Sequence, residues 1–406
     1  MSETKDNMPN LRFPEFGREW EIKLLKDIAL KKNEKNQDNK INQVLTNSAT
    51  QGIVKQDDYF DNQIANDNSI NGYYVVQKND FVYNPRISVS APVGPIKKSN
   101  IEMGVMSPLY TVFTFREGNT LFYAHYFDST RWHNYMKSIA NFGARYDRMN
   151  ITNEDFFNLP LPFPSPSEQQ KIANFLSSID LHIQLLKEKK GALENYKKGI
   201  MQKIFSQKIR LKDERGNDYP DWKERKLGKV GKFISGTGFS NKEQGGKQGI
   251  PFYKVSDMNT PENSFYMKVA NNYVAEEQAK RNAYKVIRAD AIIFAKVGGA
   301  IFLERKRVAK NFLIDNNMMS FVPEGNIIFF KYLFEMLHLS RYAQVGALPS
   351  YNASDLSVIN VNIPNSKEQQ RIANFLSAID SKISICEVQI IQSEKYKKGL
   401  LQQMFV

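Results

Sequence analysis

The chain has 406 residues, of which 41% are hydrophobic and 24% are charged, a globular composition that excludes a wholly disordered chain. Its 56 basic and 43 acidic residues leave a net charge of +13, which favours a polyanionic partner: nucleic acid first, an anionic membrane surface second, with plain basic solubility as the alternative. One cysteine and four histidines exclude a disulfide framework and a Cys/His zinc cluster.

The N-terminus, MSETKDNMPN, lacks the apolar stretch of a signal peptide. No run of about 18 apolar residues occurs, so we expect no segment that spans a membrane. The expected compartment is the cytoplasm.

Residues 1–163 are predicted to form a globular unit of mixed α and β structure. Stretches rich in β-branched and aromatic residues predict strands at Tyr73–Gln77, Phe81–Tyr83 and Leu109–Phe115. A short helix is expected within Leu121–Ser138. The length of this unit is normal for a domain.

Residues 164–208 are predicted to form a long helix. Apolar residues recur every seven positions, which is the spacing of a coiled-coil seam. These residues are Ile172, Ile179, Leu186, Leu193 and Ile200.

Residues 209–363 predict a second globular unit, with strands at Ala291–Phe294 and Met319–Val322 and a short helix within Ile327–Ser340. Residues 364–406 predict a second long helix, whose seam includes Ile372, Ile379 and Leu400. Ser167 with Gln170, and Ser366 with Gln369, fit capping boxes at the two helix starts.

The chain repeats itself at an offset of 200 residues. Residues 164–205 and 364–405 align without gaps and are identical at 20 of 42 positions. A fainter repeat at an offset of 210 aligns the first unit with the second. It pairs Tyr74, Val76, Asp80, Val82 and Arg86 with Tyr284, Val286, Asp290, Ile292 and Lys296.

The order of the repeats is cyclic, because Ile209-Arg210-Leu211 after the first helix resembles Leu11-Arg12-Phe13 near the N-terminus. Neither helix can bury its apolar seam alone. We therefore predict two α/β (α+β) globular units separated by two long antiparallel coiled-coil helices, with an internal two-fold repeat and cyclic pseudo-symmetry. Parallel pairing, or pairing with another chain, remains open at this point.

Catalytic motifs are incomplete. Asn84-Pro85-Arg86 lacks the second proline and the aromatic residue of a DNA methyltransferase motif, and Gly236-Thr237-Gly238 lacks the third glycine of a cofactor loop. His125 and His133 have no acidic third ligand in register, so a metal site is not expected there. Cys386 falls on the seam and is interpreted as a core residue.

The two long helices begin with Pro…Glu-Gln-Gln-Lys/Arg-Ile-Ala and end with Tyr-Lys-Lys-Gly, and each follows a divergent globular unit. This pattern resembles the specificity (S) subunit, HsdS, of Type I restriction–modification systems over essentially the whole chain. The resemblance implies that each globular unit is a target recognition domain for one half of a bipartite double-stranded DNA site. It also implies that the helices set the gap between the halves.

The resemblance further implies partners. Methyltransferase (M) subunits, usually two, dock on the helices, and restriction (R) subunits join them. S-adenosylmethionine, ATP and Mg²⁺ are then expected in the partner subunits, with no cofactor, metal or catalytic residue in this chain. The apolar helix residues Ile172, Ile179, Leu186, Leu193, Ile200, Ile372, Ile379 and Leu400 are the candidates for the spacer and for partner docking.

Candidate DNA-binding residues lie where polar, basic and aromatic residues interrupt apolar patterns. In the first unit they are Asn84, Arg86, Lys97, Lys98, Arg145, Tyr146 and Arg148. In the second they are Lys254, Ser256, Asn259, Lys296, Arg305, Lys306, Arg307, Ser350, Tyr351 and Asn352. Arg305–Arg307 is the preferred phosphate cluster, and Arg145 and Arg148 are preferred for base contacts.

Since the two units differ in sequence, the two half-sites are expected to differ. Two alternatives stay open: the recognition part of a combined restriction–methylation enzyme, and a coiled-coil scaffold that binds only proteins.

Overall fold

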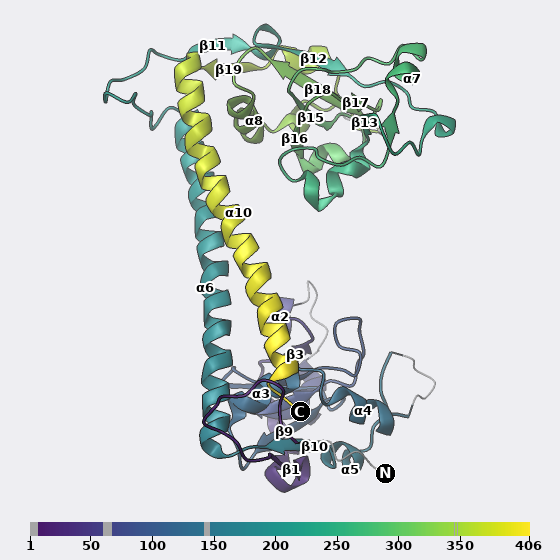
Figure 1. The fold of residues 1–406 in the computed structure, drawn as a ribbon, viewed down its shortest axis with the longest axis vertical. Coiled ribbons are helices and arrows are strands. Elements are labelled where there is room, and N and C mark those ends of the chain that lie inside the picture. The colour runs from purple at the N-terminus through teal and green to yellow at the C-terminus, as the bar shows by residue number, and fades with distance from the viewer. Residues whose placement is uncertain (1–6, 60–66, 142–146, 345, 347) are drawn as a thin grey trace. The chain divides into compact units, whose positions relative to one another are not determined.

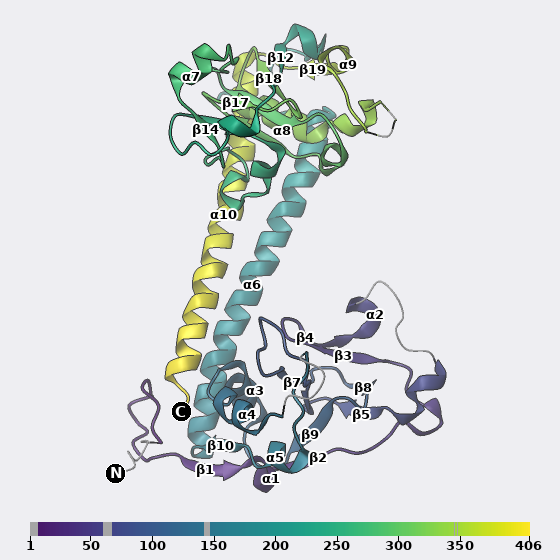
Figure 2. The same ribbon diagram turned by 90° about the vertical axis from the view of Figure 1, so that its right-hand side faces the viewer.

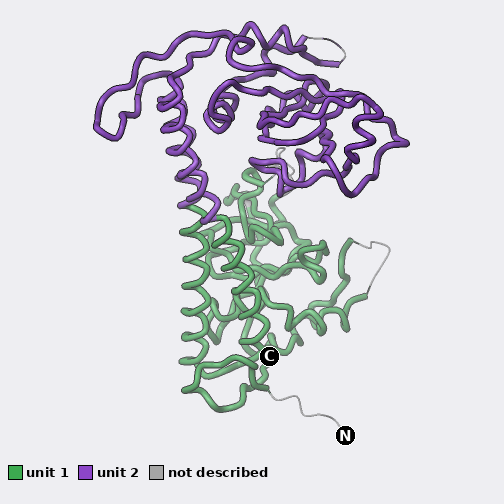
Figure 3. Tube along the Cα trace, turned by 45° about the horizontal axis from the view of Figure 1, so that its top comes forward, with its two compact units in different colours: residues 1–188, 387–406 green, residues 189–386 purple. Residues whose placement is uncertain are grey.

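The computed structural model describes residues 7–59, 67–141, 147–344, 346 and 348–406. The chain divides into two compact units (Figure 3). Unit 1 comprises residues 1–188 and 387–406, and unit 2 comprises residues 189–386. Each unit therefore contains part of both long helices, α6 (Pro166–Phe205) and α10 (Ser366–Gln403).

Unit 1 places short helices around small antiparallel sheets (Figure 1). Its strands are β1 (Glu21–Leu24), β2 (Ala29–Lys31), β3 (Leu45–Ser48), β4 (Gly52–Lys55), β5 (Tyr74–Gln77), β6 (Phe81–Tyr83), β7 (Ile96–Lys98), β8 (Met103–Met106), β9 (Thr111–Phe115) and β10 (Pro160–Phe163). Its helices before α6 are α1 (Leu25–Ile28), α2 (Gln56–Tyr59), α3 (Thr120–Asp128), α4 (His133–Ile139) and α5 (Asn153–Phe157), with 3-10 turns η1 (Gln37–Asn39) and η2 (Asp67–Gly72).

The main sheet of unit 1 has the order β2-β9-β6-β7, and β1 pairs with β10, β3 with β4, and β5 with β8. The core packs this sheet against α3 and the long helices. Phe122, fully buried on α3, belongs to the same cluster as Ile172 of α6 and Leu400 of α10. Figure 2 shows α3 beside the first turns of α6.

Unit 2 repeats this plan. Its strands are β11 (Lys223–Lys226), β12 (Gly231–Ser235), β13 (Ile250–Tyr253), β14 (Tyr273–Val274), β15 (Ala291–Ala295), β16 (Lys306–Ala309), β17 (Leu313–Ile314), β18 (Met318–Pro323) and β19 (Asn360–Ile363). Its short helices are α7 (Glu276–Arg281), α8 (Ile327–Met336) and α9 (Ala353–Ser357), with 3-10 turns η3 (Leu227–Lys229), η4 (Asn241–Glu243), η5 (Val255–Asn259), η6 (Pro261–Asn263), η7 (Gly299–Leu303) and η8 (Leu339–Tyr342).

The main sheet of unit 2 has the order β12-β18-β15-β16, the counterpart of β2-β9-β6-β7. A second sheet, β14-β13-β17, lies beside it, and β11 pairs with β19 as β1 does with β10. The expected strands and short helices are present within a few residues, except that the helix expected within Leu121–Ser138 is divided into α3 and α4.

The long helices run antiparallel within each unit, as predicted. In unit 1 Asp180 of α6 contacts Lys397 of α10 at 2.6 Å, and Lys187 contacts Glu394 at 2.6 Å. In unit 2 Lys197 contacts Asp380 at 2.8 Å. As the residue numbers rise along α6, the residues that they contact on α10 have falling numbers.

The helix caps differ from the prediction. The backbone N–H of Glu168 donates to Ser165 Oγ at 3.4 Å, and that of Glu368 donates to Asn365 Oδ1 at 3.0 Å. Ser167 and Ser366 are therefore not the caps. The true caps keep the offset of 200, which removes the one-residue mismatch between the two expected boxes.

The strand alignment at an offset of 210 is wrong by one residue. Arg116 N–H donates to Ile28 O, and Glu324 N–H donates to Val230 O, which makes β9 and β18 equivalent at an offset of 208. Phe81 pairs with Phe113, and Ile292 pairs with Phe321, so β6 matches β15 at an offset of 211. At this offset Arg86 corresponds to Val297 and not to Lys296. The difference matters because a shift of one residue turns every strand side chain to the other face of the sheet.

Candidate nucleic-acid interface

Two candidate segments of unit 1 lie side by side beyond the end of β6. Arg86 and Arg148 face each other in an antiparallel β-bridge. Ile87 N–H donates to Asp147 O at 3.0 Å, and Met149 N–H donates to Pro85 O at 3.0 Å. Residues 62 positions apart in the chain thus form one local surface.

Arg86 is the most accessible of these residues. Its side chain is 66% exposed, and its Nε lies 3.7 Å from a carboxylate oxygen of Asp147, which is 50% exposed. Arg148 is half-buried, and its Nε is buried without a hydrogen-bond partner among the described residues. Arg145 and Tyr146, the other candidates here, lie outside the described residues.

The other candidates of unit 1 are held by neighbouring side chains. Asn84 donates from Nδ2 to Asn47 O at 3.1 Å and accepts the Arg86 N–H at 3.0 Å, so it orders this turn. Lys97 forms an ion pair with Asp128 at 2.6 Å. Lys98 donates to Asn79 and Asn100, and burial, with repulsion from Lys78, lowers the pKa of its ammonium.

Unit 2 has the same bridge with different side chains. Val297 pairs with Ser350, Gly298 N–H donates to Pro349 O at 2.8 Å, and Tyr351 N–H donates to Lys296 O at 3.3 Å. Lys296 and Ser350 are half-buried and border this surface.

Two candidates of unit 2, Tyr351 and Lys306, are buried and so are not accessible to DNA. Tyr351 is 4% exposed and donates its hydroxyl to Ala295 O at 2.6 Å. Lys306 is 3% exposed, pairs with Glu304 and donates to Leu337 O at 2.9 Å. A strand position beside basic neighbours looks accessible in sequence, but the pleat turns this one inward.

The remaining candidates of unit 2 have mixed surroundings. Ser256 and Asn259 are exposed, and Asn259 accepts a hydrogen bond from Arg305. Arg307 donates from Nε to Asn263 O at 2.6 Å, and Lys254 donates to Gln244 at 3.1 Å. Asn352 caps α9 by accepting the Asp355 N–H at 3.0 Å.

The candidate helix residues lie toward the interior. Ile172, Leu186, Ile372, Ile379 and Leu400 are at most 8% exposed, and Ile179, Leu193 and Ile200 are half-buried. This burial fits the predicted seam between the two long helices.

Exposed apolar residues on the helices were missed by the heptad pattern. Leu185 and Ile385, at equivalent positions of the repeat, are 53% and 56% exposed. Tyr196 and Tyr396 are 53% and 58% exposed. The repeated Tyr-Lys-Lys-Gly motif carries the signal for the tyrosines, because it places an aromatic residue outside the heptad seam at the same position of both helices.

Beside each of these tyrosines a lysine of the same motif forms a repeated ion network. Lys397 contacts Asp180 at 2.6 Å and Asp128 at 3.6 Å. Its counterpart Lys197 contacts Asp380 at 2.8 Å and Glu335 at 3.6 Å. These lysines line equivalent clefts of about 590 Å³ in unit 1 and 410 Å³ in unit 2.

Among the described residues, no group of three or more His, Cys, Asp or Glu side chains is arranged to hold a metal ion. Within the same part of the chain, no helix has the length and apolar character needed to cross a membrane.

Comparison with known proteins points to one family. The model of the type I restriction modification DNA specificity domain matches residues 17–195 and again residues 219–393. The MjaVIII specificity subunit of a type I restriction enzyme from Methanocaldococcus jannaschii is 25% identical over 269 residues. That alignment covers 62% of this chain and 62% of the relative, so the chain spans less than two thirds of its length.

Solved structures share the fold. A chain from a structure describing complex assembly and conformational transition of the type I R-M system has a TM-score of 0.59 at 15% identity, with 95% of this chain and 97% of that chain covered. The S subunit of a type I restriction–modification system from M. genitalium has a TM-score of 0.54 at 16% identity, with 98% and 99% covered.

Proposed function

Because this chain belongs to the type I restriction modification DNA specificity family, we propose that it recognises an asymmetric bipartite site on double-stranded DNA and docks methyltransferase and restriction subunits. It is a non-catalytic cytoplasmic subunit in this proposal. S-adenosylmethionine, ATP and Mg²⁺ act in the partner subunits.

The observation that carries the proposal is that the two units share their framework but not their outer surface. The framework repeats the sheet order, the helix starts and the lysine networks. At the shared bridge, however, unit 1 presents Arg86 and Asp147, whereas unit 2 presents Val297 and Pro349. Two units with the same framework but different surface residues are expected of a protein that recognises two different half-sites.

The test is to express the chain with its methyltransferase partner in a host and to sequence the methylated positions. The expected result is one motif with two different half-sites separated by a constant gap. A symmetric methylation site would contradict the proposal.

Two further measurements separate the alternatives. A DNA affinity without salt dependence would favour the protein-binding scaffold, because phosphate contacts release counterions. Methylation or cleavage by the purified chain alone, supplied with S-adenosylmethionine or Mg²⁺, would favour the combined enzyme.

Partner docking is proposed at the exposed tyrosines. Since Tyr196 and Tyr396 occupy equivalent positions, they suit two copies of one partner. We expect Tyr196→Ser or Tyr396→Ser to leave one methyltransferase subunit bound and the double variant to leave none, as measured by the mass of the purified complex. The buried seam variant Leu186→Ile is the control, and retention of two subunits by the double variant would contradict this docking site.

A further inference from the structure

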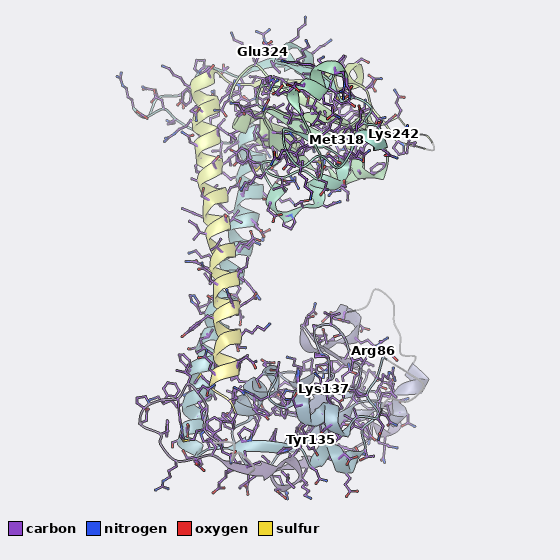
Figure 4. The ribbon with its side chains drawn as sticks, turned by 45° about the vertical axis from the view of Figure 1, so that its right-hand side comes forward. Arg86, Tyr135, Lys137, Lys242, Met318 and Glu324 are labelled. Carbon is purple, nitrogen blue, oxygen red and sulfur yellow. The ribbon has the colours of Figure 1, made fainter. Side chains whose placement is uncertain are left out.

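Arg86 and Asp147 form an exposed donor–acceptor pair on the bridge of unit 1. They come from different segments, and their charged groups lie 3.7 Å apart. Figure 4 shows the Arg86 side chain at the surface of unit 1. An ion pair this exposed contributes no more than about 1 kcal/mol to stability, so the fold does not require it.

The backbone beneath this pair is held from both sides. Hydrogen bonds from Ile87 to Asp147 and from Met149 to Pro85 join the segments. The Asn84 side chain receives the Arg86 N–H and donates to Asn47 on β3. Because the backbone at Arg86 and Asp147 is already fixed, only the two side chains lose conformational freedom when a ligand binds.

The chemistry of the pair matches one kind of base pair. In the major groove, guanine presents two acceptors, O6 and N7, which a guanidinium binds with two parallel donors. The cytosine opposite presents an N4 amino donor, which a carboxylate accepts. Adenine–thymine pairs lack this arrangement, because adenine offers a donor beside N7.

We propose that Arg86 and Asp147 together read one G·C base pair in the half-site bound by unit 1, Arg86 on guanine and Asp147 on cytosine. This inference rests on the proposed function. The equivalent positions in unit 2, Val297 and Pro349, carry neither group, so unit 2 does not make this contact.

A phosphate contact by Arg86 is the competing role, and Arg86→Lys separates the two. A lysine retains a phosphate contact as a point charge but lacks the planar fork that binds guanine. The neighbouring carboxylate also favours base reading, since it would repel a phosphate.

The experiment uses the complex of the full chain with its methyltransferase partner. The variants are Arg86→Ala, Arg86→Lys, Asp147→Ala and the double alanine variant, with Arg18→Ala, an exposed arginine of the same unit, as the matched control. Methylated motifs are sequenced, and binding is measured on duplexes changed at each position of both half-sites, over a range of salt concentrations.

We expect all four variants to relax the same G·C position, with the discrimination at that position falling about 5- to 150-fold for Arg86→Ala. The other half-site and the Arg18→Ala motif stay unchanged. The double variant is expected to fall short of the product of the single effects, since both residues read one base pair.

Three outcomes would overturn the inference while leaving the proposed function intact. These are uniform weakening on all sequences with a smaller salt slope, relaxation at two different positions, and an unchanged motif. If the unmodified chain directs no bipartite methylation, the proposed function itself fails.

Discussion

The Glu-Gln-Gln sequence at the start of each long helix forms hydrogen bonds with the globular part of the same unit, and these contacts are called the anchor. Glu168 is 2% exposed and receives two hydrogen bonds from Arg12, at 2.7 and 2.8 Å. Gln169 accepts the Asn119 N–H at 2.8 Å, and Gln170 accepts from Asn119 Nδ2 at 2.8 Å. Unit 2 repeats every contact through Arg210, Glu368, Asn326, Gln369 and Gln370.

Removing Arg12 tests this anchor. Arg12→Ala leaves a buried carboxylate unpaired, so we expect unit 1 to lose about 3–5 kcal/mol of stability in denaturant titrations. The double variant Arg12→Met, Glu168→Leu should recover most of this loss, because it removes both charges.

The control for this prediction is Lys23→Ala, which breaks an exposed pair with Glu117 and should cost about 1 kcal/mol or less. An Arg12→Ala variant no less stable than this control would show that the anchor is not structural.

We expect the buried His125 to make the stability of unit 1 depend on pH. His125 on α3 forms a hydrogen bond with Ser177, and the distance between His125 Nε2 and Ser177 Oγ is 3.1 Å. Burial lowers the pKa of its imidazole below 6.5, and the nearby Lys397 acts in the same direction against the opposing charges of Asp180 and Asp128. The folded state therefore binds the proton less readily than the unfolded state.

We expect unit 1 to be most stable above about pH 6.5 and to lose stability as pH falls below that value, by at most about 1.4 kcal/mol per pH unit for this group. Unit 2 has Tyr332 at the equivalent position, with its hydroxyl 2.6 Å from Asp380. His125→Tyr should therefore flatten the profile measured by thermal denaturation between pH 5 and 7.5, whereas the exposed His182→Tyr should not. If stability changes equally with pH in the unmodified chain, in His125→Tyr and in His182→Tyr, His125 is not the source of the pH dependence.

At the scale of elements, the two long helices share one register. The pairs Asp180–Lys397 and Lys197–Asp380 place residues whose numbers sum to the same value opposite each other. An α-helix of 40 residues such as α6 is about 60 Å long. A change in one helix alone therefore displaces one of the two ion networks.

Inserting one heptad after Glu188 and another after Cys386 keeps the seam and lengthens the paired helices by about 10 Å. Under the proposed function we expect the gap in the methylated motif to grow by about 3 base pairs, since one base pair rises about 3.4 Å. Both half-sites should be unchanged; altered half-site bases would contradict a spacer role. Inserting the heptad in α6 alone should lower stability.

At the scale of the whole molecule, the halves are equal in framework and unequal in charge. Residues 1–205 carry a net charge of +3 and residues 206–406 carry +10. Similar sheets and helix anchors do not require this difference. The difference therefore belongs to the surfaces, where the proposed function places the phosphate and partner contacts.

Because the anchors are duplicated, a chimera in which residues 20–163 replace residues 222–363 should fold, with Asn119 meeting Gln369 and Gln370 in place of Asn326. Under the proposed function, and because the helices run antiparallel, two copies of one globular unit should recognise a half-site and its inverted repeat. We expect sequencing of methylated DNA to show a symmetric motif, and the reciprocal chimera to show a symmetric motif of the other half-site. A motif that stays asymmetric in either chimera would contradict the exchange.

The repeat, the two long helices and the family resemblance could all be predicted from the sequence alone. Those features follow from periodicity and identity along the chain, where the apolar seam can be buried only by a second helix of the same pattern. The sequence did not determine which strand side chains face outward. A pleated strand reverses its faces with a shift of one residue, and a faint repeat could not exclude that shift.

Which basic residues are accessible depends on how the chain folds. The local pattern of basic residues predicts both Lys97 and Lys306 as DNA-binding residues, yet Lys97 is paired with Asp128 and Lys306 is buried beside Glu304. Arg86 and Asp147 become a pair only because two distant segments join in a bridge. Burial and pairing depend on neighbours that are remote in the chain, and no local pattern of residues records them.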